Sequence, residues 1–369
     1  MTIWELTRTL PRARQQSASG ADRVLLLAPS CGLGGGIERY VQTVQSAFDD
    51  VGVVSKRLDL ARPGLGGHRA LLAKAAATLA ATPTPTRLVI AHRALLPLAA
   101  LLARIRNVGG ISIICHGTDV WGGRWSPRRG LEAWLMDRPY VRLVAVSSFT
   151  AGTLLPRGRA TILPPGLSRA WFSELVTAAG QAGGRSRKDL EVMTAFRLSD
   201  WRDKGLAQLT AAITQLGRTD IRLMVCGSGE PPADLLAHIR SYPWCTLCPG
   251  LTDADLSARY AQADIFVLAT RTRPGARPSG EGFGLVLLEA QVAGTAVVGP
   301  ALGGSPDAYL DGVTGATPRD ESAAALAAVL DGLADQPARM ADMGRQGAAW
   351  ARARFAPDQY ATLAADRLL

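Results

Sequence analysis

The feature that most constrains the fold of this chain is the alternation of short apolar runs with helical patterns. Runs at 24–28, 111–115, 192–196 and 221–226 indicate buried strands, and most of them lead through a glycine-containing turn into a helical pattern. This order of elements is typical of α/β proteins with parallel sheets. The 369 residues are enough for two domains, each with its own core.

The stretch 280–290 carries the clearest chemical signal, because a glycine-rich loop passes there into an apolar helical pattern. Glu281 and Glu289 lie eight residues apart, which is just over two helical turns, so we expect them on similar faces. A carboxylate within an apolar helix is costly to bury unless it is hydrogen-bonded. The hydroxyls of a sugar or a ribose are suitable partners for such a group.

Backbone groups at the start of the same helix favour an anion. Glycines allow the chain to approach a ligand closely, and the free N–H groups of a helix N-terminus attract negative charge. We therefore expect an anion to meet the N–H groups of Phe283, Gly284 and Leu285.

Polar groups also follow several predicted strands, at the sheet edge where ligands bind in open α/β folds. His116 begins the segment His-Gly-Thr-Asp after the strand at 111–115. Arg197 stands at a strand end, and Lys204 stands at the mouth of the next helix, where two fixed cations would hold a diphosphate. The glycine turn at Gly227 can admit a nucleotide base.

The segment 29–39 forms a strand–glycine loop–helix junction of the kind that binds phosphates or sugars. It contains four glycines, but Ile37 stands where the dinucleotide fingerprint requires a third glycine. A dinucleotide site of that type is therefore not expected.

The net charge of +10 suits anionic ligands such as sugar nucleotides, lipid head groups or nucleic acid. Seven arginines and three tryptophans lie within 121–159, a composition that suits an anionic acceptor or a membrane interface. A solvated arginine-rich face is the plainer alternative. Because no nucleic-acid motif accompanies these residues, no nucleic-acid partner is expected.

Several features favour a cytoplasmic protein. The five cysteines are odd in number and indicate reduced thiols, and residues 1–22 form a basic arm without the apolar core of a signal peptide. The apolar stretch 94–103 is too short to span a bilayer and contains Pro97. Contact with the inner face of the membrane remains compatible with this composition.

Taken together, these motifs resemble those of the retaining, two-domain glycosyltransferases of family 4. This is the group 1 family, which includes the phosphatidylinositol mannosyltransferases. The resemblance is carried by the Glu-x7-Glu segment with Gly-Phe-Gly, by Gly-Gly-x-Glu at 35–38, by His-Gly-x-Asp at 116–119, and by Arg…Lys-Gly at 197–205. It covers residues 24–369.

The resemblance implies a GT-B fold, in which two Rossmann-like domains face a cleft and a C-terminal helix crosses back to the first domain. On this basis we expect an N-terminal arm at 1–22, an acceptor-binding domain at 23–172, a linker or loop at 173–190, and a nucleotide-sugar domain at 191–355. Residues 356–369 would return to the first domain.

The resemblance also implies roles for single residues. Arg197 and Lys204 would hold the diphosphate, Glu281 the hydroxyls of the donor sugar, and Glu289 the ribose. His116 would lie beside the sugar ring. Backbone contacts to the phosphates and the base would come from Gly35, Gly36, Gly227, Leu251, Phe283, Gly284 and Leu285. Because these basic groups already hold the diphosphate, neither a metal nor a cofactor is expected.

The implied activity is a glycosyltransferase of the hexosyltransferase class, which moves a sugar with retention from a nucleotide diphosphate sugar to a hydroxyl. GDP-mannose is the favoured donor and a UDP-sugar the alternative, whereas the acceptor could be a lipid, a glycan or a small molecule. An epimerase of the same fold, a pseudo-glycosyltransferase and a binding protein with a degenerate site remain as rivals.

Overall fold

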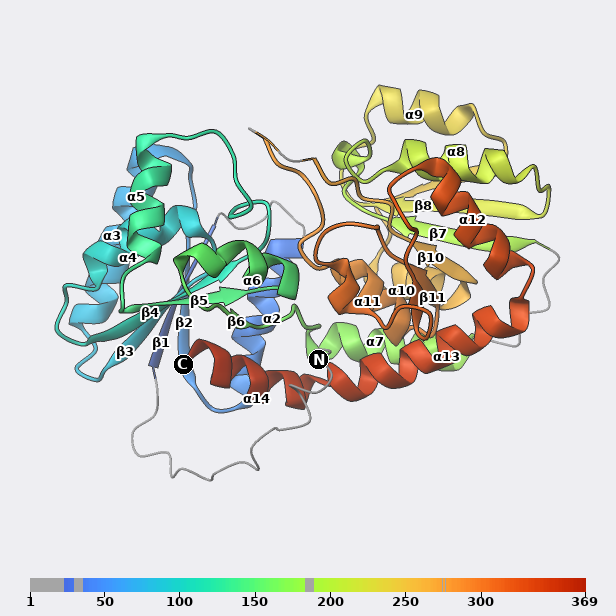
Figure 1. Ribbon diagram of the computed structural model, residues 1–369. Helices are drawn as coiled ribbons and strands as arrows, with labels where there is room; N and C mark the ends of the chain where they lie inside the picture. The colour runs from blue at the N-terminus through green and yellow to red at the C-terminus, as the bar shows by residue number, and fades with distance from the viewer. Residues whose placement is uncertain (1–22, 30–35, 183–188, 274, 276) are drawn as a thin grey trace.

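The structure is a computed structural model that describes residues 23–29, 36–182, 189–273, 275 and 277–369. The expected arm at 1–22 and the candidate Gly35 lie outside these residues. The described chain forms two α/β domains that stand side by side, each built on a parallel six-stranded sheet (Figure 1). The α/β class predicted from the alternating runs is confirmed.

The first sheet has the strand order β2-β1-β3-β4-β5-β6. Its strands are β1 (Arg23–Ala28), β2 (Val54–Asp59), β3 (Thr86–Ile90), β4 (Val108–Cys115), β5 (Val141–Ala145) and β6 (Thr161–Ile162). The helices of this domain are α2 (Gly36–Asp50), α3 (Gly64–Ala80), α4 (Leu96–Leu102), α5 (Pro127–Met136) and α6 (Ser148–Leu154), with short 3-10 helices η1 (Arg93–Leu95) and η2 (Leu155–Arg157).

The second sheet has the order β12-β11-β10-β7-β8-β9. Its strands are β7 (Leu190–Ala195), β8 (Ile221–Gly227), β9 (Cys245–Pro249), β10 (Ile265–Val267), β11 (Ala296–Val298) and β12 (Gly315–Ala316). Its helices are α7 (Arg169–Gln181), α8 (Leu206–Leu216), α9 (Ala233–Arg240), α10 (Asp253–Gln262), α11 (Leu285–Val292), α12 (Ala323–Ala334) and α13 (Pro337–Arg354), with 3-10 helices η3 (Leu198–Asp200) and η4 (Ser305–Ala308).

Both faces of each sheet are buried, which explains why the strands are continuous apolar runs. In β1, Leu25 and Leu27 pack in a core with α3 and α4, while Val24 and Leu26 face the opposite side and pack with α2. Consecutive strand residues point to opposite faces, so an entirely apolar strand needs a helical layer on each side.

The final helix, α14 (Pro357–Leu368), leaves the second domain and packs against α2 of the first (Figure 1). Its residues Tyr360, Ala361, Ala364 and Leu368 are buried in the core of the first domain. A Cβ added to Gly166 would lie 2.6 Å from the ring of Tyr360, so only glycine fits beneath that ring. The predicted crossing of the C-terminal helix is confirmed.

The linker or loop expected over 173–190 is wrong for its first part. Residues up to Gln181 belong to α7, and Leu175 and Ala178 are buried in the core of the second domain. Ser168 caps the helix by accepting a hydrogen bond from the N–H of Trp171 at 3.4 Å. Of the small residues that suggested a linker, Ala178 faces this core, and residues 183–188 lie outside the described part.

Candidate active site

Loops from the two domains meet in backbone contact at the carboxyl ends of their strands. A Cβ on Gly282 would lie 1.9 Å from the carbonyl oxygen of His116, and one on Gly304 would lie 2.4 Å from Oγ of Ser147. Real Cβ atoms do not approach other atoms so closely, so these glycines allow the contact. The predicted His-Gly-x-Asp and Glu-x7-Glu motifs are thereby brought together.

A carboxylate from the second domain reinforces this contact. Asp307 in η4 accepts hydrogen bonds from the backbone N–H and the hydroxyl of Ser148, at the start of α6. The free N–H groups of a helix N-terminus favour a negative charge. The first domain is thus tied to the loop that carries Gly303 and Gly304.

His116 is held as a neutral imidazole. Its Nε2 lies 2.6 Å from the carbonyl oxygen of Ala91, so Nε2 carries the proton and Nδ1 does not. Burial lowers the pKa of His116 from 6.5 to about 4, and the hydrogen bond to Ala91 offsets only part of that shift. The ring of Tyr40 stands edge-on to it at 5.5 Å. A neutral imidazole can accept a hydrogen bond from a hydroxyl.

The loop around His116 is fixed by Asp119. Its Oδ1 accepts hydrogen bonds from the backbone N–H groups of His116 at 3.0 Å and Gly117 at 2.8 Å. Burial raises the pKa of Asp119, and its Oδ2 has no hydrogen-bond partner among the described residues. The carboxylate shapes the turn through one oxygen, and its other oxygen is buried.

Lys204 and Glu281 form an ion pair at the opposite side of this contact. Nζ of Lys204 lies 2.8 Å from Oε2 of Glu281, and the hydroxyl of Thr270 donates to the same oxygen at 3.1 Å. The lysine follows η3 and precedes Gly205, which adopts φ +71° and where a Cβ would lie 1.8 Å from the carbonyl oxygen of Ala269. The structure therefore brings together two of the predicted site residues.

Arg197 lies on the same loop as Lys204, at the start of η3. The side chain of Arg197 is exposed. Within the same loop, the backbone N–H of Lys204 donates a hydrogen bond to the carbonyl oxygen of Asp200 at 3.0 Å. The predicted pair of cations therefore shares one short, hydrogen-bonded segment.

The start of α11 offers backbone donors, as predicted. Gly284 has φ +87°, a conformation that side chains rarely adopt. Within the described residues, the N–H groups of Phe283, Gly284 and Leu285 donate to no carbonyl or side chain. The buried hydroxyl of Ser305, which also lacks a partner there, would lie 3.2 Å from a Cβ on Gly284. These unpaired groups are suited to an anion.

Several of the positions predicted to offer backbone contacts also have a role in the packing or hydrogen bonding of the fold. The ring of Phe283 is buried against Phe355, with the ring centres 6.2 Å apart. Gly227 passes so close to Phe196 that a Cβ would lie 2.2 Å from its carbonyl oxygen. The carbonyl of Gly227 accepts a hydrogen bond from Gly250, which places Leu251 beside it. Gly36 is the first residue of α2.

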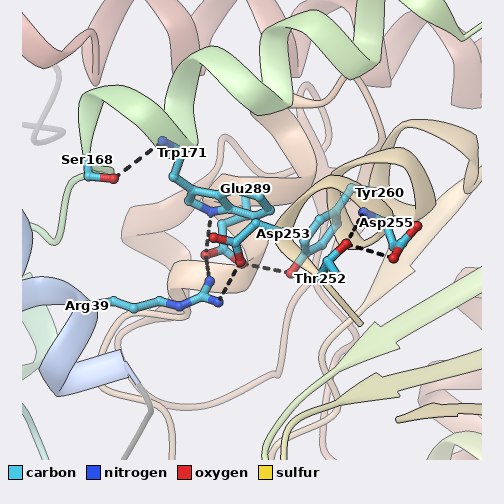
Figure 2. A network of polar contacts seen from close by, with 8 residues as sticks. All are labelled: Arg39, Ser168, Trp171, Thr252, Asp253, Asp255, Tyr260 and Glu289. Atoms are coloured by element: carbon cyan, nitrogen blue, oxygen red, sulfur yellow. Dashed lines mark hydrogen bonds and ion pairs between the residues drawn. The ribbon is translucent and has the colours of Figure 1, made fainter. Parts of the chain in front are cut away.

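Glu289 is buried in the middle of α11 and accepts three hydrogen bonds (Figure 2). Its Oε1 accepts from Nη1 of Arg39 at 2.9 Å and from Nε1 of Trp171 at 3.0 Å. Its Oε2 accepts from the hydroxyl of Tyr260 at 2.8 Å. Glu289 thus has protein partners from α2, α7 and α10, where the sequence predicted a ribose.

The sequence did not indicate these partners. Trp171 and Tyr260 lie in apolar helical patterns and resemble ordinary core residues. Arg39 directly follows the Gly-Gly-Ile-Glu segment, but nothing local relates it to a carboxylate 250 residues later.

Comparisons with known proteins identify the family of this chain. Residues 190–336 match the family of glycosyl transferases group 1. A GDP-mannose-dependent α-(1-6)-phosphatidylinositol monomannoside mannosyltransferase of Mycolicibacterium smegmatis is 32% identical over 270 residues, which is 69% of each chain. The chain belongs to the group 1 glycosyltransferases.

The protein with the same description from Mycobacterium tuberculosis is 30% identical to this glycosyltransferase over 286 residues, covering 74% of this chain and 73% of that protein. A D-inositol 3-phosphate glycosyltransferase of Pseudarthrobacter chlorophenolicus is 30% identical over 57% of this chain and 53% of that one. The predicted enzyme class, a glycosyltransferase, is therefore confirmed.

Solved structures establish the fold of this glycosyltransferase. Anabaena HepE in complex with UDP and glucose superposes with a TM-score of 0.70 at 17% identity, covering 93% of this chain and 98% of that one. The sucrose-phosphate synthase of Thermosynechococcus elongatus gives 0.73 at 17% identity, covering 94% and 98%. The predicted GT-B fold is confirmed.

No helix among the described residues has both the length and the apolar composition needed to cross a bilayer.

The pKa of His116 predicts how the stability of this glycosyltransferase changes with pH. Between pH 6.5 and about 4 the unfolded chain binds a proton at this residue and the folded chain does not, so stability falls as the pH falls through this window. His116→Gln keeps a donor for Ala91 but does not titrate. We expect the melting temperature of this variant to fall less steeply with falling pH than that of the wild type. The corresponding difference in the free energy of unfolding is roughly 3 kcal/mol at most over the window. If the melting temperatures of the variant and the wild type changed equally with pH, the lowered pKa of His116 would be contradicted.

Proposed function

We propose that this glycosyltransferase moves mannose from GDP-mannose to a hydroxyl of a lipid, glycan or small-molecule acceptor, with retention and without a metal. The main support is the start of α11, where the Lys204–Glu281 ion pair adjoins unpaired backbone donors. This arrangement offers a cation and N–H groups for a diphosphate and a carboxylate for sugar hydroxyls.

GDP-mannose is favoured because two relatives are described as GDP-mannose-dependent, and the match to this chain spans more than two thirds of the length of each. A UDP-sugar is the second candidate, because the structure of HepE, which shares the fold, was determined with UDP and glucose. An epimerase or a pseudo-glycosyltransferase would use similar phosphate-binding residues. The epimerase would turn over the nucleotide sugar without an acceptor.

In the proposed reaction, the acceptor oxygen attacks the anomeric carbon from the face that the leaving diphosphate occupies, through an oxocarbenium-like state. The bond to the diphosphate breaks, and a phosphate oxygen takes the proton of the acceptor hydroxyl. Charge on the diphosphate grows as the bond breaks, so Lys204 and Arg197 stabilise the transition state more than the bound donor. Because His116 is neutral, it accepts a hydrogen bond from the sugar and carries no positive charge.

The first test measures the melting temperature with GDP, UDP, ADP, their sugars and EDTA. Ligands that bind only the folded state raise it. We expect the largest rise with GDP or GDP-mannose and no loss of that rise with EDTA. NMR of the product would then show the same anomeric configuration as the donor. A larger rise with UDP would overturn the donor assignment, and an inverted product would overturn the retaining mechanism.

The diphosphate role of Lys204 gives a second prediction. Lys204→Met removes the ammonium, and we expect kcat/KM to fall about 100-fold, the usual loss when one charge-stabilising donor is removed. Arg202→Met is the matched control, because Arg202 is an exposed cation on the same loop that pairs with Asp234. A Lys204 variant as active as the Arg202 variant would refute the role.

We also propose that the first domain contacts an anionic membrane through α4 and α5. Leu101, Leu131, Trp134 and Tyr140 are exposed around one hollow there, with Arg104 in its lining. The guanidinium of Arg138 stacks on Trp134 at 4.0 Å. Amphipathic aromatics beside arginines suit a lipid interface.

Sedimentation with vesicles tests this surface. We expect binding to vesicles that contain phosphatidylglycerol and weaker binding to pure phosphatidylcholine, since the attraction is partly electrostatic. Trp134→Ala should reduce the bound fraction, whereas Val313→Ala, an exposed apolar residue of the second domain, should not. Equal binding of both variants would exclude this surface.

A further inference from the structure

The three donors on Glu289 differ in how easily they can leave. Trp171 and Tyr260 are 8% and 0% exposed and belong to the core of the second domain. The side chain of Arg39 is 42% exposed and reaches across from α2 of the first domain (Figure 2). Of these three, only Arg39 can withdraw without disturbing the core.

Other contacts of Arg39 are long. Its Nη2 lies 3.8 Å from the exposed carboxylate of Asp253, and its guanidinium lies 5.6 Å from the centre of the Trp171 ring. The short bond to Glu289 is therefore the principal attachment of the Arg39 head group among its described contacts. Because the Arg39 side chain is 42% exposed, a ligand can reach this bond, and a ligand that brings its own hydroxyl donors can replace the guanidinium at the buried carboxylate.

The geometry of the carboxylate limits what else Glu289 can accept. A carboxylate has about four lone-pair positions, two on each oxygen. Arg39 and Trp171 occupy both positions of Oε1, and Tyr260 occupies one of Oε2. One position is left, whereas a ribose presents two hydroxyls.

From these contacts we propose that Arg39 is a gate on the ribose site, which competes with the ribose of the donor for Oε1 of Glu289. In the nucleotide-free state Arg39 closes the site and ties α2 to α11. When the donor binds, its ribose hydroxyls take the place of Arg39, and the buried carboxylate is never left without donors. The inference rests on the proposed function, because it takes the ribose to bind at Glu289.

The exchange makes Arg39 a positioning residue with a recognisable effect on affinity. Removing the guanidinium removes the competitor, so ribonucleotides should bind more tightly. A nucleotide without ribose hydroxyls does not displace Arg39 and should gain nothing. A guanidinium that simply bound phosphate would have the opposite effect, because its loss would weaken both ligands equally.

Isothermal titration of the full chain with GDP and 2′,3′-dideoxy-GDP tests the gate, with UDP and its dideoxy analogue used if UDP is the preferred nucleotide. For Arg39→Met we expect the Kd of the ribonucleotide to fall about 2- to 5-fold and that of the dideoxy analogue to stay unchanged. Melting curves establish that the variant is folded.

Arg169→Met is the matched control. Arg169 also joins the domains, through Asp50 of α2 and Asp358 of α14, but it does not contact Glu289. We expect its ratio of the two Kd values to equal that of the wild type. If Arg39→Met and Arg169→Met changed the ratio alike, general loosening of the domains would be the cause and the gate would be wrong.

The remaining outcomes also discriminate. Equal weakening of both nucleotides by Arg39→Met would make Arg39 a phosphate ligand, and an unchanged or weaker affinity for the ribonucleotide would likewise overturn the competition. If neither the wild type nor the variants bound any nucleotide, the proposed function itself would fail, and the gate with it.

Discussion

The buried carboxylate of Glu289 is the constraint on which much of the structure depends. A carboxylate removed from water requires hydrogen-bond donors, and those of Glu289 come from α2, α7 and α10. The packing of α7 and α10 around α11, and the approach of the first domain through Arg39, therefore converge on one side chain. One side chain of α11 therefore has hydrogen-bond partners in both domains.

A second determinant is the pair of glycines at which the loops of the two domains meet. Gly282 and Gly304 allow the loop of one domain to lie against His116 and Ser147 of the other. Fixed polar groups then stand on both sides of the contact, with the Lys204–Glu281 pair on one and a neutral imidazole on the other. Backbone contact provides the precision that long, mobile side chains would not, because fewer rotatable bonds separate the groups.

The sequence predicted those features that depend on local patterns. Apolar runs indicated the strands. The motif residues could be proposed from local segments: His116 from the strand before it, Lys204 from the helix after it, and Glu281 from its glycine-rich loop. What it missed depends on distant contacts. The pairing of Arg39 with Glu289 spans 250 residues, and Trp171 looked like core. Small residues in the second half of α7 suggested a linker, because composition does not reveal that a segment forms a helix with one buried face.

The position of α14 has a consequence for how the protein is made. The core of the first domain includes Tyr360 and Leu368, which are separated from its last strand by the whole second domain. During synthesis on the ribosome, that core stays open until the second domain has emerged, and the face of α2 that α14 covers is exposed meanwhile. The first half to be translated is thus the last to be completed, and an apolar helix face of this kind is a natural binding site for a chaperone.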